Sequence, residues 1–358
     1  MKRIYILAAA ALALFSCIAK TEDDTVSKAT DYFDAWLKIN YPEAREHGMG
    51  VYVIEDTPGT GPYWDSTYIF TTYTATSLDG TVSYTGKEDM AKQIGTYKSS
   101  NYYGPVVLTT GESLCYAGIE AILGGEGTAG KLPKMRVGGT RKAVIPSWLM
   151  TYSRYTSADK YKENIGNKTA ASAIYTITLE EQTDDIIRLQ CDITEDRGPI
   201  GIFQLQKFID EKMGGIDSMY VAGNDSLQKR GFYFQSLKKP SEKEIPSDST
   251  VYVNYIGRLL DGRVFDTTIA DTAKFYGIWN SSRTYKPLPV VKNGTCTKLT
   301  LDGSTTVTGF AGGIYLMHEN EKARVAFSSD LGYGSSSKGI VPAYAPLVFD
   351  LELTNAPE

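Results

Sequence analysis

Four segments of the chain have the pattern of β-strands. Apolar residues recur at alternate positions in 173–179 and 347–353, the period of two that places one face of a strand on a core. Segments 68–73 and 251–255 are short runs of tyrosine, valine, phenylalanine and threonine, which favour strands. Together the four segments predict a structure rich in β-sheet.

Two further segments have the pattern of helices. Apolar residues recur at helical spacing in 29–39 and in 202–213, and Pro42 and Gly214-Gly215 end these stretches. Each apolar stripe is expected to pack against a neighbouring sheet, and the alternative is a dimerisation arm. The stripes consist of Tyr32, Phe33, Trp36, Leu37 and Ile39 in the first helix and of Phe203, Leu205, Phe208 and Ile209 in the second.

One unit occurs twice along the chain. In the N-terminal copy, Tyr73 is followed six residues later by Asp79-Gly80, and in the C-terminal copy Tyr255 is followed six residues later by Asp261-Gly262. An Asp-Gly pair between apolar runs is a hairpin signal, so each pair predicts a turn between two strands. The two copies are expected to meet within 182–198.

Composition narrows the class of protein. A length of 358 residues favours two domains, and a net charge of -5 without a long basic run argues against nucleic-acid binding. The two histidines, His47 and His318, form no cluster with cysteine, so neither a metal nor a cofactor is expected. Cys115, Cys191 and Cys296 lack a CxxC spacing; free or buried thiols are expected, and a disulfide is the alternative.

The first 17 residues have the features of a targeting segment. Lys2-Arg3 precede an apolar run, 4–15, that is too short to span a bilayer comfortably. The run ends in Leu14-Phe15-Ser16-Cys17, which resembles the lipobox of bacterial lipoproteins; the alternative is an ordinary signal peptide with an incidental cysteine. We therefore expect lipidation of Cys17, a tether over 18–28, and a lipid anchor in the cell envelope, with the outer membrane favoured.

Five motifs follow one another in the C-terminal copy. They are the strand 251–255, Phe265-Asp266 after the Asp-Gly turn, Val307-Thr308-Gly309-Phe310, Leu331-Gly332-Tyr333-Gly334 and the last strand 347–353. With these motifs in this order, 251–353 resembles the FKBP-type peptidyl-prolyl isomerases. Segment 68–179 resembles that family more weakly, so the whole chain is similar to tandem FKBP-like lipoproteins of Bacteroidota.

The resemblance implies an α+β fold. Two FKBP-like domains are expected, each a curved antiparallel β-sheet wrapped around one short helix and each preceded by a helical segment. In the second copy the short helix is expected at 309–316. The expected division is a signal peptide with a lipobox cysteine over 1–17, a tether over 18–28, a degenerate FKBP-like domain over 29–182, a helical connector over 183–230 and an FKBP-like isomerase domain over 231–358.

The resemblance also implies a pocket in the C-terminal copy. Aromatic side chains would form a dry wall around a proline ring, the Tyr333 hydroxyl and the Val307 N–H would hold a carbonyl oxygen, and Asp266 would orient Tyr255. Segment 269–295 is expected to be a long loop of unassigned role, and Leu299 takes the place of a further aromatic residue. The implied catalytic residues are Tyr255, Phe265, Asp266, Phe310, Tyr333 and Phe349, and the implied substrate-binding residues are Val307, Ile340 and Val341.

Prolyl isomerisation, the activity that the resemblance implies, needs no nucleophile and no proton transfer. The expected partners are proline-containing unfolded or extended client proteins, a membrane through the lipid anchor, and an FK506-like macrolide. The first copy has Ser83-Tyr84 in place of Phe265-Asp266, and is expected to be inactive. The alternatives are a non-catalytic FKBP-fold chaperone and, third, a binder of glycans or host proteins.

Overall fold

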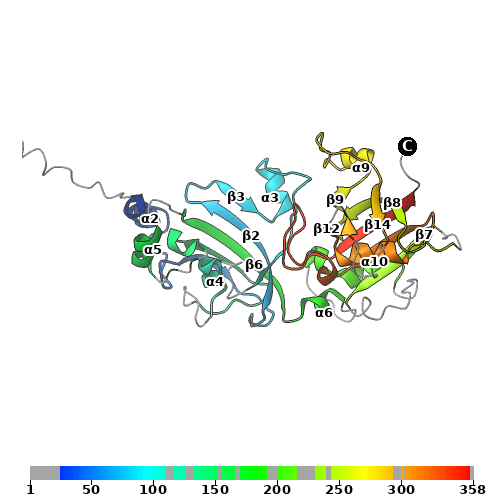
Figure 1. Cartoon of the computed structure of the whole chain (residues 1–358). Coiled ribbons are helices and arrows are strands. Elements are labelled where there is room, and N and C mark those ends of the chain that lie inside the picture. Colours follow the sequence, from blue (N-terminus) through cyan, green and yellow to red (C-terminus); the bar gives the residue numbers. More distant parts are fainter. Residues whose placement is uncertain are drawn as a thin grey trace, which may run out of the picture.

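The computed structural model contains two six-stranded antiparallel sheets that lie side by side (Figure 1). Cys17, Cys115, Cys296 and Leu299 lie outside the described part of the chain. The structure describes residues 25–109, 116–125, 132–151, 153, 155, 157–165, 170–191, 200–215, 230–238, 243–292, 300–301 and 304–354.

The first sheet has the strand order β1-β5-β6-β2-β3, and β4 also pairs with β2. These pairings are antiparallel, and β6 lies at the centre between β5 and β2. Its strands are β1 (Tyr52–Thr57), β2 (Tyr68–Ser77), β3 (Val82–Thr85), β4 (Val106–Thr109), β5 (Thr140–Ile145) and β6 (Ala173–Thr183).

The second sheet repeats this arrangement. Strands β7, β13, β14, β8 and β9 follow one another as β1, β5, β6, β2 and β3 do, and β10 pairs with β8 as β4 pairs with β2. Its strands are β7 (Phe232–Lys238), β8 (Thr250–Arg258), β9 (Val264–Thr267), β10 (Leu288–Val291), β13 (Lys322–Phe327) and β14 (Leu347–Thr354), and a separate hairpin contains β11 (Thr300–Leu301) and β12 (Ser304–Thr305).

The register of the central strands is the same in both copies. Ala75 lies opposite Tyr175 in the first sheet, and Gly257 lies opposite Phe349 in the second. Alternate residues of β14 are buried, among them Phe349 and Leu351, because a strand with one face on a core has a period of two. The predicted α+β fold with two copies of one unit is therefore confirmed.

Helix α2 (Thr25–Asn40) covers the outer face of the first sheet. Phe33 and Leu37 pack with Val144 of β5 and Ile174 of β6, so the predicted packing against a sheet is confirmed. The stripe is narrower than predicted, because Tyr32 and Ile39 are 58% and 79% exposed. A helix that packs on one sheet buries a single face, and these two side chains lie outside it.

Helix α7 (Leu205–Lys212) covers the outer face of the second sheet in the same way, with Leu205 and Ile209 against Ala326 and Val348. The predicted helix 202–213 is divided, because Gln204 leaves the helical conformation after a short 3-10 turn. Phe203 consequently belongs to a different core from the rest of its stripe. Further short helices are α5 (Ala158–Ile165), α6 (Ile186–Cys191), η1 (Ser147–Leu149), η2 (Gly201–Phe203) and η4 (Ser329–Leu331).

Helix α10 (Thr308–Leu316) packs against β13 and β14 and begins one residue before the predicted start. Gly309 permits this close contact, since a Cβ atom there would lie 2.3 Å from the ring of Phe327. The first copy repeats the contact in α4 (Ala117–Leu123), where a Cβ at Gly118 would lie 2.3 Å from Ile145. Each sheet therefore carries one short helix at the same place.

The segment predicted as a long loop, 269–295, contains regular structure. Helix α9 (Ala270–Phe275) begins it, and β10 pairs with the edge of β8. The first copy has the same arrangement in α3 (Glu88–Gln93) and β4. The interval between Tyr68 and Thr109 equals that between Thr250 and Val291, so no insertion separates the copies here. The expectation of an unstructured loop was wrong.

The two copies share a core. Phe70 of β2 stacks edge-on against Phe203 at a centroid distance of 5.0 Å, and both belong to the hydrophobic cluster of the second copy. Arg263, in the turn between β8 and β9, donates to Glu88 of α3 at 2.5 Å. Residues of α6 and η2 complete this cluster, so these described parts of the segment between the copies pack on the second copy.

Two further expectations concern cysteine and membrane-spanning segments. Cys191 is a free thiol, and burial raises its pKa to about 11. Within the described residues, no helix is both long and apolar enough to cross a membrane. The predicted anchor at Cys17 lies outside those residues and stays a prediction.

Candidate functional site: an aromatic cluster with a tyrosine–carboxylate pair at its edge

Four aromatic side chains from four different elements meet inside the second copy. Phe349 of β14 is the central ring: it lies 5.1 Å from Phe310 of α10, 5.6 Å from Phe265 of β9 and 6.0 Å from Tyr255 of β8, as centroid distances. Edge-to-face contacts of this kind add to the free energy of burial. Tyr255, Phe310 and Phe349 are buried, and Phe265 is half-buried at the edge.

Glycine at the neighbouring strand position makes room for two of these rings. A Cβ atom at Gly257 would lie 2.7 Å from the ring of Phe265 and 3.0 Å from that of Phe349. Phe349 also stacks on Phe327 of β13, at 5.8 Å, on the side of the core. The aromatic cluster is therefore continuous with the core of the sheet, and Phe327 packs behind it.

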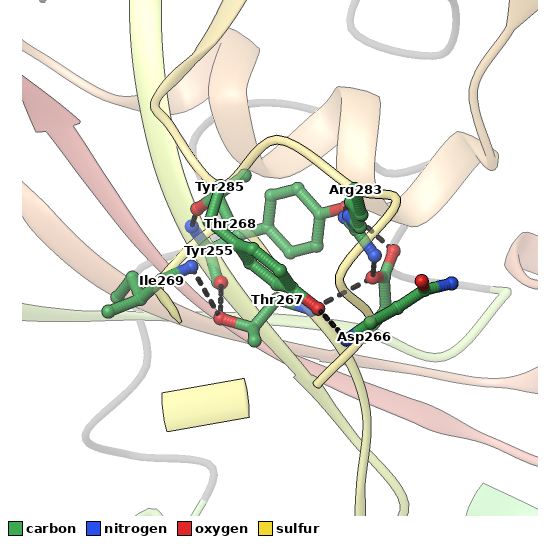
Figure 2. A network of polar contacts seen from close by, with 8 residues as sticks. Tyr255, Asp266, Thr267, Thr268, Ile269, Arg283 and Tyr285 are labelled. Carbon is green, nitrogen blue, oxygen red and sulfur yellow. Dashed lines mark hydrogen bonds and ion pairs between the residues drawn. The ribbon is translucent and has the colours of Figure 1, made fainter. Parts of the chain in front are cut away.

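A carboxylate lies next to the tyrosine of the aromatic cluster, and Figure 2 shows Asp266 beside Tyr255 and Arg283. The Tyr255 hydroxyl donates to Oδ2 of Asp266 at 2.7 Å. Arg283 donates through Nη1 to Oδ1 of the same carboxylate, and its Nη2 lies 3.3 Å from the Tyr255 oxygen. The three side chains form a triangle in which each contacts the other two.

The backbone of β9 holds Asp266 in place. The Thr267 N–H donates to Asp266 Oδ1 at 2.9 Å, and the Thr267 hydroxyl donates to the Tyr255 carbonyl at 2.7 Å. Thr268 accepts from the Tyr255 N–H at 2.9 Å. These bonds join the end of β9 to the strand that carries Tyr255 (Figure 2). The tyrosine and the carboxylate are thereby fixed to one another by main chain as well as by side chains.

The two tyrosines of the site stay protonated at neutral pH. Burial, and next the charge of Asp266, raise the pKa of Tyr255 well above its usual range. Burial and the same carboxylate also raise the pKa of Tyr333. Both hydroxyls are therefore neutral hydrogen-bond donors rather than acids or bases. A site of this kind can bind and orient a polar group in an apolar surrounding, but it offers no nucleophile.

The remaining predicted residues lie around the pocket. Val307 is the residue immediately before α10, and Tyr333 follows the short helix η4. Tyr333, Val307 and Ile340 are partly buried against the cluster that contains the four rings. Val341 is only 1% exposed and belongs to that cluster itself, so it supports the pocket more than it lines its surface. The structure thus brings the nine predicted residues to one region.

Arg283 was not predicted. A carboxylate among aromatic rings needs a cationic or hydrogen-bonding partner, which is a signal that could have prompted a search. Segment 269–295 offers four candidates, Lys274, Arg283, Lys286 and Lys292, and sequence alone does not rank them. Arg283 is placed by the turn that Tyr285 stabilises, because the Tyr285 hydroxyl accepts from the Asn280 N–H at 2.9 Å.

The equivalent place in the first copy has different chemistry. Tyr73 corresponds to Tyr255 and lies 4.6 Å from Tyr84 and 5.8 Å from Tyr175, as centroid distances. Tyr84 stands where Asp266 stands in the second copy, and Asn101 stands where Arg283 does. The first copy keeps an aromatic cluster but has no carboxylate–guanidinium pair at these positions.

In the described part of the chain, no three histidine, cysteine, aspartate or glutamate side chains are grouped so that they could hold a metal ion. The two histidines lie far apart in the sequence, one in each copy. His318 instead contacts Glu321 at 3.6 Å from Nδ1.

Comparison with known proteins identifies the family. The profile described as FKBP-type peptidyl-prolyl cis-trans isomerase matches residues 241–354. The macrophage infectivity potentiator of Trypanosoma cruzi is 32% identical over 125 residues, 34% of this chain and 52% of that protein. FK506-binding protein 1 of Dictyostelium discoideum is 30% identical over 109 residues, 30% of this chain and 81% of that protein. The chain belongs to the FKBP-type peptidyl-prolyl isomerase family.

The match is to one part of the chain and one part of its relatives. The chain spans about half the length of the trypanosomal protein. Among solved structures, FkpA from Escherichia coli is 22% identical, with a TM-score of 0.28 over 42% of this chain and 54% of that one. The three FKBP domains of wheat FKBP73 are 16% identical, with a TM-score of 0.27 over 87% of this chain and 97% of that one. The family assignment rests on the sequence relatives.

Proposed function

We propose that the chain is a peptidyl-prolyl cis-trans isomerase whose active site is the aromatic pocket of the second copy. The observation that carries the proposal is the Tyr255–Asp266 hydrogen bond of 2.7 Å at the edge of the four-ring cluster. At this bond, aromatic side chains that exclude water meet a polar group held in a fixed position. We expect rotation of a prolyl amide to need both. Family membership supports the same reaction.

The proposed mechanism is non-covalent. Amide resonance sets a barrier of about 18–20 kcal/mol to rotation about the X-Pro bond. The planar amide has more charge separation than the twisted one, so a dry pocket destabilises the ground state relative to the transition state. Phe265, Phe310 and Phe349 would surround the proline ring. Tyr333 would donate to the carbonyl oxygen, and Asp266 would hold Tyr255 and polarise the pocket edge.

The test uses the full chain and a short prolyl peptide. Replacing Asp266→Asn is expected to lower kcat/KM by about tenfold or more, since a hydrogen bond to a charged group is worth about 1.5–3 kcal/mol. Asp271→Asn is the matched control, because that carboxylate lies on the surface of the adjacent helix with a side chain that is 94% exposed. Isomerisation by the wild-type chain no faster than the uncatalysed rate would overturn the proposal and favour a non-catalytic chaperone.

We also propose that the pocket binds an FK506-like macrolide, as FK506-binding protein 1 of Dictyostelium discoideum does according to its name. If the macrolide competes with the short peptide for the pocket, its dissociation constant from a binding assay should equal its inhibition constant from the turnover assay. Phe310→Ala should weaken macrolide binding and peptide turnover together, because the ring forms part of the wall for both. Tight binding without inhibition of peptide turnover would show that the macrolide binds outside the proposed pocket.

We further propose that Cys17 is acylated and that the protein acts on extended, proline-containing proteins of the cell envelope, with the outer membrane favoured. The supporting observation is the apolar run followed by Leu14-Phe15-Ser16-Cys17. Incorporation of labelled fatty acid into the wild-type chain but not into Cys17→Ala, together with recovery in the outer-membrane fraction, is expected. Label retained by Cys17→Ala, or release of the wild-type chain without detergent, would contradict the anchor.

A further inference from the structure

The surface of the first copy that corresponds to the pocket faces the second copy. Tyr84 and Asn101 stand at the positions of the Asp266–Arg283 pair, and Tyr103 stands at that of Tyr285. The Tyr103 hydroxyl accepts from the Lys98 N–H at 3.0 Å, as the Tyr285 hydroxyl accepts from that of Asn280. The local backbone is therefore kept, while the charged pair is replaced by neutral side chains.

A cleft of about 750 Å³ lies at this surface. One wall is the first copy, with Tyr84, Ser100 and Asn101, and the other is segment 337–342 of the second copy, with Ser337 and Ile340. None of the described residues that line the cleft carries a charge. The volume lies within the range of about 300–1,000 Å³ of sites that bind small ligands, enough for a few residues of a peptide.

The wall from the second copy also belongs to the pocket. Val341 lines the cleft and is buried in the cluster that contains Tyr255, Phe310 and Phe349. Ile340 lines the cleft and packs against the same cluster. Reciprocal backbone bonds of 2.9 Å between Lys338 and Val341 hold this segment in one conformation. One loop thus has the aromatic pocket on one side and the cleft on the other.

Contacts between the copies hold the two walls of the cleft together. Arg263 of the second copy donates to Glu88 at 2.5 Å and to the Asn101 carbonyl at 3.1 Å. Its guanidinium also lies 5.9 Å and 5.5 Å from the ring centroids of Tyr102 and Tyr103. A second contact is made where the backbone at Gly277 approaches Ser99, whose hydroxyl would lie 3.3 Å from a Cβ there. The cleft is therefore built by specific contacts and is not a gap between independent units.

We propose that this cleft binds an extended, uncharged stretch of the same client chain whose prolyl bond occupies the aromatic pocket. The proposal rests on the proposed function and assigns the first copy a role as a substrate-binding subsite. The hydroxyl and amide groups of Ser100, Asn101 and Ser337 can bond to the backbone of an extended peptide, and the Tyr84 ring can cover an apolar side chain. A charged side chain would lose hydration there without an ionic partner, so charged stretches are disfavoured.

Peptide length separates this subsite from the pocket. A peptide of about four residues spans roughly 14 Å when extended and can occupy the pocket alone, whereas one of about fourteen residues spans roughly 48 Å and can reach the cleft. The full chain is expected to have a kcat/KM for the long uncharged peptide that exceeds that for the short one by about tenfold, which corresponds to about 1.4 kcal/mol. Glutamates placed along the flanks of the long peptide should remove this advantage.

Two variants test the walls separately. Ser100→Trp fills the cleft from the first copy and Ser337→Trp fills it from the second, and each is expected to lower the long-to-short ratio of kcat/KM toward one. Ser336→Trp is the matched control, because Ser336 is an exposed neighbour that does not line the cleft. Circular dichroism verifies that each variant is folded. Two independent variants on opposite walls keep the test decisive if one of them misfolds.

Binding is measured alongside turnover. Fluorescence anisotropy of the labelled long peptide should show weaker binding to Ser100→Trp and Ser337→Trp than to the wild type and to Ser336→Trp. If the wild type turns over neither peptide, the proposed function fails, while the anisotropy result still decides whether the cleft binds peptide. Equal ratios and equal affinities in all four proteins would overturn the subsite.

Discussion

Asp266 has two partners whose contributions differ. Tyr255 is buried and donates to one oxygen, so this bond lies in a surrounding of low polarity where it is strong. Arg283 pairs with the other oxygen at the surface, where the two side chains are 40% and 34% exposed. Solvent screens the second contact, so we expect Arg283 to position the carboxylate rather than to supply most of its effect.

Replacing Arg283→Gln is therefore expected to have a smaller effect than Asp266→Asn. Exposed ion pairs are worth about 0.2–1 kcal/mol, so kcat/KM should fall by a factor of about 1.4 to 5. The double variant should resemble Asp266→Asn alone, because the arginine acts through the carboxylate. Lys286→Gln, an exposed cation of the same segment, is the control. A loss for Arg283→Gln as large as that for Asp266→Asn would indicate that the guanidinium contacts the substrate directly.

The raised pKa values of Tyr255 and Tyr333 predict a simple pH dependence. The folded state favours the neutral hydroxyl, so the stabilisation is complete below about pH 10, the usual value for tyrosine, and is lost as the pH rises above it. We expect kcat/KM for the short peptide to be constant from about pH 6 to about pH 9 and to fall in the alkaline range. A bell-shaped profile centred near neutrality would indicate an acid or a base instead.

At the scale of single residues, the sequence predicted the aromatic residues of the site but not Arg283. The order of the motifs and the family resemblance grouped Phe265, Phe310 and Phe349 in one site, and the structure brings the rings of Phe265 and Phe310 within 6 Å of the ring of Phe349. Arg283 depends on a turn that follows α9, and Phe327 depends on the side of the sheet from which a neighbouring strand packs. Such contacts arise from tertiary packing, so no periodic pattern in the sequence predicts them.

Among the elements, α10 carries Phe310, which would form the floor of the proposed pocket. Gly309 lets α10 lie close to the sheet. Gly309→Ala would place a methyl group 2.3 Å from the Phe327 ring, so either the helix or the ring must move. We expect a loss of about 1–3 kcal/mol in the free energy of unfolding, typical of overpacking, together with reduced turnover because Phe310 is the next residue. Urea denaturation and the short-peptide assay measure both. Tyr315→Ala, at an exposed position of α10, should change neither greatly.

The strands and long helices could be predicted because their periods extend over many residues, but the segment after Asp266 could not. Helix α9 has six residues, and β10 has four with a proline among them, so neither offers enough turns or alternations to be recognised. Comparison of the two copies provides the missing signal, since the equal intervals across both segments indicate equal structures.

For the whole molecule, the sequence predicted two copies but not how they contact each other. Phe70 follows Ile69, a residue of the first copy's own core, yet it packs on Phe203 within the core of the other copy. The residues of α6 and η2 belong to that core too, so a chain that began at residue 231 would lack Ile186, Leu189, Ile202 and Phe203. The second copy is therefore expected to depend on the connector for stability.

The Arg263–Glu88 contact predicts how the two copies respond to acid. A hydrogen bond from Lys92 lowers the pKa of Glu88, burial opposes the shift, and the charge of Arg263 lowers the pKa further. The stabilisation is therefore complete above the ordinary pKa of glutamate, about 4.3, and is lost as the pH falls through the lower folded-state value.

Energy transfer between one dye on each copy should stay constant from about pH 7 to about pH 5 and then decline, as the contact weakens. Glu88→Gln should give the low-pH value at every pH, while Asp89→Asn, an exposed carboxylate of the same helix, should follow the wild type. A decline in Glu88→Gln identical to that of the wild type would show that other groups control the interface.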